Sequence, residues 1–161
     1  MLKRVTLRLV SLRHTVGGSL FEGGGRLTAE ASDPPARMEM TTRARYLDNG
    51  ERVSISYEES ELTGMQGSTA TVSFSKGEPG VISMLRNGSV KTSLLFEAGK
   101  QHDCVYQTPI MPFDVRLLTH EVENRLEQDG TLRLCYTLQL RGAEPERTEL
   151  VLTMLSGCDV P

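Results

Sequence analysis

The sequence predicts an all-β protein, an antiparallel up-and-down barrel of roughly eight to eleven short strands. Apolar and polar residues alternate along many segments, and turn signals separate these segments at intervals typical of a sandwich or barrel. The alternation has no fault over residues 132–141, where leucines and one tyrosine occupy the even positions. Successive side chains of a strand point to opposite faces, so this pattern is typical of a half-buried strand. A barrel is favoured over a sandwich because only closure removes exposed strand edges.

The first strand is expected near the N-terminus, where alternate apolar residues from Val5 to Leu9 share one face. Val10 and Leu12 continue in the opposite phase, which predicts a bulge or bend within this strand. Residues 17–25 are rich in glycine. They have neither the spacing of a phosphate-binding loop nor a helix after them, so we interpret them as a loose hairpin or surface connection.

The next elements are bounded by strong turn signals. A short strand over 27–31 and a longer one over 37–46 precede Asp48-Asn49-Gly50, which predicts a hairpin with a type I′ turn. Asn87-Gly88 predicts a second tight turn. The other expected strands are 53–57, 72–74, 81–86, 94–96, 102–108, 113–119, 132–141 and 150–154.

Helical periodicity is nearly absent from the sequence. Residues 119–128 come closest to it, but Val122 and Leu126 alone form a thin apolar stripe. No repeat or domain boundary interrupts the pattern, so we expect one domain over residues 1–161, a length suited to a single core.

Composition excludes several classes of protein. With 38% hydrophobic and 24% charged residues, the chain is an ordinary globule rather than a disordered segment. The formal net charge of -3 gives no basic footprint for nucleic acid. Arg37, Arg43 and Arg45 do cluster, but Glu39 lies among them, so we interpret them as a solvated strand face and leave nucleic-acid binding as a minor alternative.

Cysteine usage and targeting signals favour a cytoplasmic protein. Three cysteines, at positions 104, 135 and 158, are an odd and sparse set for a secreted disulfide scaffold. Polar residues interrupt the N-terminal stretch where a signal peptide would need an apolar core. No apolar run approaches the roughly 20 residues of a membrane helix, so we expect no membrane partner.

Residues 57–69, Tyr-Glu-Glu-Ser-Glu-Leu-Thr-Gly-Met-Gln-Gly-Ser-Thr, resemble the signature of the YwiB-like family of small calycin-like (lipocalin-like) barrels of bacteria. The similarity runs from about Arg43 to Met154 and continues at Arg86, Gly88, Leu95, Phe96, Glu97, Gly99, Lys100, Tyr106, Gln107, Thr108, Pro109, Thr119, Asp129, Gly130 and Tyr136. This resemblance implies a barrel of the lipocalin kind, which the alternation predicts independently. It implies no activity, although lipocalin-like folds often hold small lipophilic molecules.

The parity of the strands predicts which polar groups point into the barrel. The expected inward set is Tyr57, Glu59, Arg86, Tyr106, Thr119 and Tyr136. A buried ionisable group is costly unless it is paired, so an inward arginine indicates either a partner or a ligand. Two interpretations therefore stay open. Arg86 and Glu59 orient a small lipophilic or anionic ligand inside the barrel, or they pair with each other and only close the fold.

Other chemistry is weaker in this sequence. His102 and Cys104 share one side of a strand, but no pair-and-pair spacing predicts zinc, and we expect a solvated histidine and a packed cysteine. Cys135 falls on the polar face with no histidine indicated beside it. We therefore expect no metal, no cofactor and no enzyme activity. The alternative to a ligand-binding barrel is an interaction module that contacts protein or nucleic acid through an outer face or the loop 60–68.

Overall fold

The computed structural model describes residues 2–21, 27–28, 35–59 and 67–155. These residues form strands and turns without a helix, and so contain no helix long and apolar enough to cross a membrane. The strands are β1 (Leu2–Thr15), β2 (Gly17–Gly18), β3 (Leu27–Thr28), β4 (Ala36–Asp48), β5 (Arg52–Glu58), β6 (Thr69–Ser75), β7 (Glu78–Asn87), β8 (Thr92–Glu97), β9 (Gln101–Gln107), β10 (Pro112–Arg125), β11 (Thr131–Leu140) and β12 (Glu146–Leu155).

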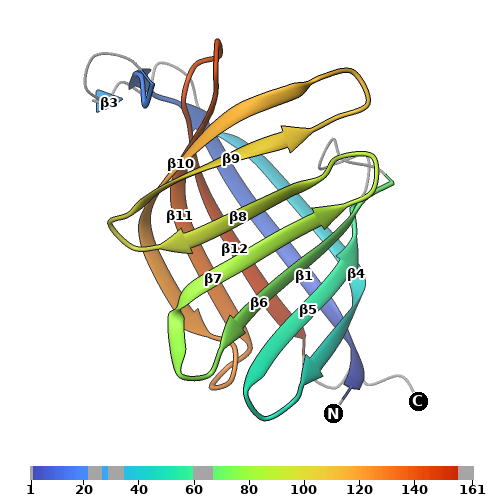
Figure 1. Ribbon diagram of the computed structural model, residues 1–161. Helices are drawn as coiled ribbons and strands as arrows, with labels where there is room; N and C mark the ends of the chain where they lie inside the picture. Colours follow the sequence, from blue (N-terminus) through green and yellow to red (C-terminus); the bar gives the residue numbers. More distant parts are fainter. Residues whose placement is uncertain (1, 22–26, 29–34, 60–66, 156–161) are drawn as a thin grey trace.

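Ten strands form one antiparallel sheet that curls into a nearly closed barrel (Figure 1). Their order is β8-β7-β6-β5-β4-β1-β12-β11-β10-β9, so strands next in sequence are also neighbours in space, and β1 lies between β4 and β12. The two ends of the sheet, β8 and β9, meet at one bridge between Lys91 and Gln107, with N–O distances of 2.9 and 2.8 Å. The predicted all-β, up-and-down barrel is confirmed.

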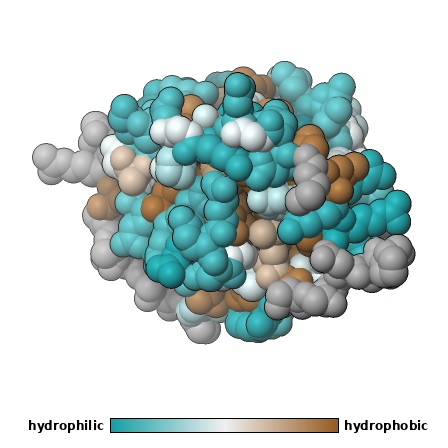
Figure 2. Space-filling model, turned by 90° about the horizontal axis from the view of Figure 1, so that it is seen from below, coloured by the Kyte–Doolittle hydropathy of each residue, from teal (hydrophilic) through white to brown (hydrophobic). Residues whose placement is uncertain are grey.

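Leucine-bearing faces of the strands line the interior, as the alternation predicts. Leu132 pairs with Leu152 and Leu134 with Leu150, and all four side chains are buried. The inner faces of β5, β6, β7 and β8 supply the opposite wall of the core, with Val53, Ile55, Val72, Phe74, Ile82, Met84, Leu94 and Phe96. Seen from below, hydrophilic residues surround a smaller apolar area near the middle of the view (Figure 2).

The predicted bulge in β1 is wrong. The pairing of β1 with both neighbours runs without a shift, and Leu7, Leu9 and Ser11 all stay buried. Val10 and Leu12 lie half-buried on the outer face instead. A half-exposed apolar residue costs little, whereas a phase change would break ladder hydrogen bonds on both sides of this central strand. Register shifts occur instead in β6 and β10.

Both predicted hairpins are present, but the first does not use a type I′ turn. That turn needs a positive φ at Asn49, and no described residue other than glycine has one. Within this turn only Gly50 has a positive φ, of 92°. Asn49 Oδ1 accepts hydrogen bonds from the amides of Glu51 and Arg52. At the second hairpin Gly88 has φ 147°, and a Cβ there would lie 2.3 Å from the carbonyl oxygen of Gly67. Only glycine fits that close approach.

Residues 119–125 form part of β10, so the weak helical pattern over 119–128 is not a helix. Pairing of this segment with β11 on one edge outweighs its local preference. The glycine-rich segment is only partly a surface connection. Leu20 is buried, its amide donates to Gln139 Oε1 over 2.6 Å, and Arg116 donates to its carbonyl oxygen over 2.7 Å. Residues 22–25 and 29–31 of the expected loop and strand lie outside the described residues.

Candidate ligand site inside the barrel

The six predicted site residues come from the inner faces of β5, β7, β9, β10 and β11, together with the residue that follows β5. All six side chains are buried or mostly buried: Tyr57, Glu59, Arg86, Tyr106, Thr119 and Tyr136. Sheet register explains how several of them meet. Tyr57 pairs with Ala70, Ala70 with Arg86, and Arg86 with Thr92, so these four residues form one row across the strands. The small Ala70 side chain leaves room for the guanidinium beside Tyr57.

An ion pair between Arg86 and Glu59 is the centre of this cluster. Arg86 Nε donates to Glu59 Oε1 over 3.1 Å, and the two side chains are only 12% and 1% exposed. The amide of Glu59 donates to the carbonyl oxygen of Ser68 over 2.8 Å, which holds the backbone just beyond β5. A charge pair this deep stabilises the fold only when its other polar atoms are also satisfied.

Three tyrosines surround the guanidinium of Arg86 and stay neutral. Burial raises the pKa of Tyr106 to about 12, although the nearby Arg86 cation opposes the rise. Burial also raises the pKa of Tyr57, with a smaller contribution from the Glu59 charge, and burial raises the pKa of Tyr136. Burial lowers the pKa of Arg86, but the surrounding phenols and Glu59 outweigh it and the net direction is upward. The cluster thus presents neutral phenolic hydroxyls beside the ion pair of Arg86 and Glu59.

Thr119 lies at the edge of this group. It pairs with Tyr136 across β10 and β11, and the Tyr136 ring packs on Phe96 with centroids 4.9 Å apart. Thr119 lies beside Tyr136, and no hydrogen bond to Arg86 or Glu59 is found for it among the described residues. Three buried side-chain oxygens have no hydrogen-bond partner among the described residues: Glu59 Oε2 and Thr119 Oγ1 of this group, and Ser11 Oγ of β1.

Sequence reasoning missed a further inward polar group on β9. His102 is half-buried and its Nε2 atom is buried without a hydrogen-bond partner, so the expected solvated histidine is wrong. Its parity with Cys104 and Tyr106 is the signal that places it inside. Cys104 is packed as expected, because its side chain contacts the hydrophobic core. No group of three metal-ligating side chains occurs within the described ranges.

The remaining sequence candidates lie elsewhere. Cys135 is on the outer face as predicted but is buried there, with Arg147 Nη2 3.6 Å from its sulfur. Cys158 and residues 60–66 of the loop 60–68 lie outside the described residues. The alternative of an interaction module that uses this loop therefore stays a prediction.

Comparison with known proteins identifies the family. The model of a domain of unknown function, DUF1934, matches residues 26–152, which is most of the chain. The fold is similar to that in the crystal structure of the ywiB protein from Bacillus subtilis. The TM-score is 0.65 and the identity 16%, over 96% of this chain and 94% of that one. None of the curated proteins matches this sequence. The chain belongs to the DUF1934 family, and its fold is that of the YwiB-like, calycin-like β-barrels.

Proposed function

We propose that the barrel binds a small, largely apolar molecule whose N–H or O–H group faces Glu59. The observation that carries this proposal is the partnerless Glu59 Oε2, buried beside Arg86. A buried acceptor without a donor loses about 1–3 kcal/mol relative to water, so native proteins seldom retain one without a reason. A ligand donor at Oε2 would remove that loss.

The surroundings of Glu59 favour a neutral ligand over an anionic one. Arg86 already has Glu59 as its counter-charge at 3.1 Å, so the cation is compensated. Beside this cation the free hydrogen-bonding capacity lies on Glu59 Oε2, which accepts a hydrogen bond from a donor. Aromatic rings of Tyr57, Tyr106 and Tyr136 would contact an apolar body, as in typical ligand sites that combine apolar walls with a few polar groups.

Outer surfaces support this choice over an interaction module. Arg133 on β11 donates to Glu121 over 2.6 Å and to Glu149 over 2.8 Å, so its charge is balanced in an exposed network. Solvated pairs of this kind are ordinary surface features. The inner cluster, by contrast, retains polar groups where water is scarce.

Titration with N-phenylnaphthylamine tests the proposal, because this fluorescent probe is apolar and carries one N–H donor. We expect saturable fluorescence enhancement with the wild type, and at least about tenfold weaker binding with Glu59→Gln, in which a charged acceptor is lost. Arg125→Gln is the control, since Arg125 lies on the outside and pairs with Asp129.

Tyr106→Phe is a second variant that removes one hydroxyl without changing the charge, and circular dichroism checks that each variant folds. Native mass spectrometry of freshly purified protein would show a co-purifying molecule that the Glu59 variant lacks. Equal probe binding by wild type and by both inner variants would overturn the proposal, and so would the absence of saturable binding.

A further inference from the structure

A separate feature of the outer face is a set of three arginines on neighbouring strands. Arg4 of β1 pairs directly with Arg45 of β4. Arg43 lies two residues before Arg45 on β4, on the same face. Directly opposed residues of an antiparallel pair have Cα atoms about 4.5–5.5 Å apart, and alternate residues of a strand are about 7 Å apart. Like charges so placed destabilise a sheet. The arrangement is therefore unfavourable without a compensating negative charge.

Other arginines on the same two strands do have that compensation. Arg8 Nη2 lies 2.7 Å from Glu39 Oε1, and Arg37 Nη2 lies 2.9 Å from Glu39 Oε2. Among the described residues, by contrast, Arg4, Arg43 and Arg45 have no carboxylate within 4.0 Å. Glu58 is the acidic residue closest to them along the sheet, because it follows Tyr57, the last residue of β5 that pairs with β4.

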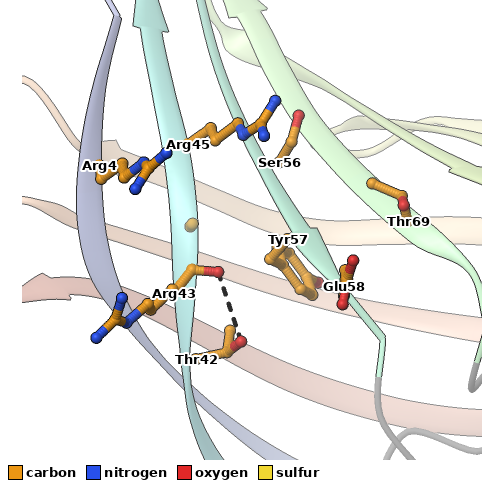
Figure 3. Close-up of a pocket in the computed structure, with 9 residues that line it drawn as sticks. Arg4, Thr42, Arg43, Arg45, Ser56, Tyr57, Glu58 and Thr69 are labelled. Carbon is orange, nitrogen blue, oxygen red and sulfur yellow. Dashed lines mark hydrogen bonds between the residues drawn. The ribbon is translucent and has the colours of Figure 1, made fainter.

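These arginines line a groove of about 620 Å³. Pairing between β4 and β5 stops at Ala44 and Tyr57, while β4 continues as far as Ala36 with β1 alone, and the groove opens at this point. In Figure 3 the Arg45 side chain reaches from β4 toward Ser56, whereas the Arg43 side chain extends the other way, across β1. Glu58 and Thr69 lie on the far side of the groove. Its volume falls within the roughly 300–1,000 Å³ of small-molecule sites.

We propose that this groove binds a compact dianion that carries phosphate or carboxylate groups. Three arginines and one glutamate leave two positive charges in the lining, which two negative charges would balance. Arginine forks bind phosphate and carboxylate oxygens through paired hydrogen bonds, and the hydroxyls of Ser56 and Thr69 add donors. The groove shares Tyr57 with the Arg86 cluster, but its charged residues do not belong to that cluster, and the proposal does not rest on the cluster's function.

Charge distribution distinguishes this ligand from a nucleic acid. A nucleic-acid strand is followed by an extended basic track. Here Glu39 pairs with both Arg8 and Arg37, the next arginines along β1 and β4, and the net charge of the chain is -3. A carboxylate thus interrupts the row of arginines beyond the groove.

Isothermal titration of the full chain with methyl phosphate, glycerol phosphate and succinate, at a pH where each is a dianion, tests the site. We expect saturable binding of at least one of these dianions that weakens as sodium chloride is added. Arg43→Gln and Arg45→Gln should each weaken it about tenfold or more, and Arg125→Gln, which removes the same charge elsewhere, should not. Comparison of the two phosphate compounds with succinate tells which oxyanion the groove accepts.

Thermal unfolding gives a second readout that does not need the natural ligand. Sodium sulfate should raise the Tm of the wild type above its value in sodium chloride of equal ionic strength, and the difference should be smaller in Arg45→Gln than in Arg125→Gln, since both variants keep the general stabilisation by sulfate. In dilute buffer Arg45→Gln should itself melt about 1–3 °C higher, because it removes an opposed like charge. Equal binding by wild type and both groove variants would overturn the proposal. Binding of a single-stranded oligonucleotide without binding of any of the three dianions would overturn it as well.

Discussion

Arg86 lies inside the barrel with a carboxylate 3.1 Å away, whereas Arg4, Arg43 and Arg45 lie on the outer face without one in the described structure. The inner cation is only 12% exposed, so a counter-charge offsets most of the cost of its burial. Water and salt screen the outer cations, so the sheet tolerates two of them directly opposite each other at a modest cost. The same residue type is thus paired inside the barrel and has no carboxylate partner among the described residues of this outer region.

Arg86→Ala should produce the largest loss of stability among single charge deletions. It leaves the Glu59 carboxylate buried and uncompensated, a change that costs about 3–5 kcal/mol. Arg133→Ala breaks two exposed ion pairs and should cost about 0.2–1 kcal/mol. Urea unfolding followed by circular dichroism measures both. Similar losses for the two variants would show that Arg86 is not isolated from water.

The double variant Glu59→Met/Arg86→Met sharpens the comparison. Replacing both members of a buried pair by apolar residues of similar size leaves no uncompensated charge, so we expect little or no loss of stability, in contrast to Arg86→Ala. A double-mutant cycle from urea unfolding gives the coupling energy. Additive single losses would contradict a direct interaction between the two side chains.

The pH at which the tyrosines ionise should distinguish buried side chains from solvated ones. The pKa of all four tyrosines is raised, to about 12 for Tyr106, mainly by burial. The unfolded chain releases these protons near pH 10, and the folded chain retains them to higher pH. Stability is therefore complete below about pH 10 and falls above it, by about 1.4 kcal/mol per pH unit for each such tyrosine.

Ultraviolet absorbance of tyrosinate during a pH titration measures this effect. The absorbance should rise at higher pH in buffer than in denaturant. Coincident titration curves would mean that the interior tyrosines are solvated.

His120 provides the smallest expected effect, on the outer side. Partial burial and then the Arg147 charge lower its pKa from 6.5, and its Nε2 lies 2.7 Å from Thr137 Oγ1. The unfolded chain binds this proton first as pH falls, so stability should decline below about pH 6.5. His120→Gln should flatten that decline in thermal unfolding between about pH 7 and 5. If the Tm of His120→Gln falls with pH as that of the wild type does, the decline is due to carboxylates and not to His120.

The amino-acid pattern by itself determined the barrel. Strict alternation over 132–141 places the leucines on one face of the strand. These leucines are shielded from water only if that face points into the core. It also identified Tyr57, Glu59, Arg86 and Tyr106 as inward, because parity along a strand is a local property. Periodicity misplaced the bulge in β1, since the two neighbouring strands keep the register of a central strand whatever its own residues prefer.

Only the tertiary structure decided which inward groups meet. The row Tyr57–Ala70–Arg86 depends on the register between three strands, and no single strand contains that information. The sequence predicts only a solvated strand face at Arg37, Arg43 and Arg45. Arg4 and Arg45 are distant in the chain. They lie opposite each other only because the hydrogen bonds of the sheet place β1 beside β4.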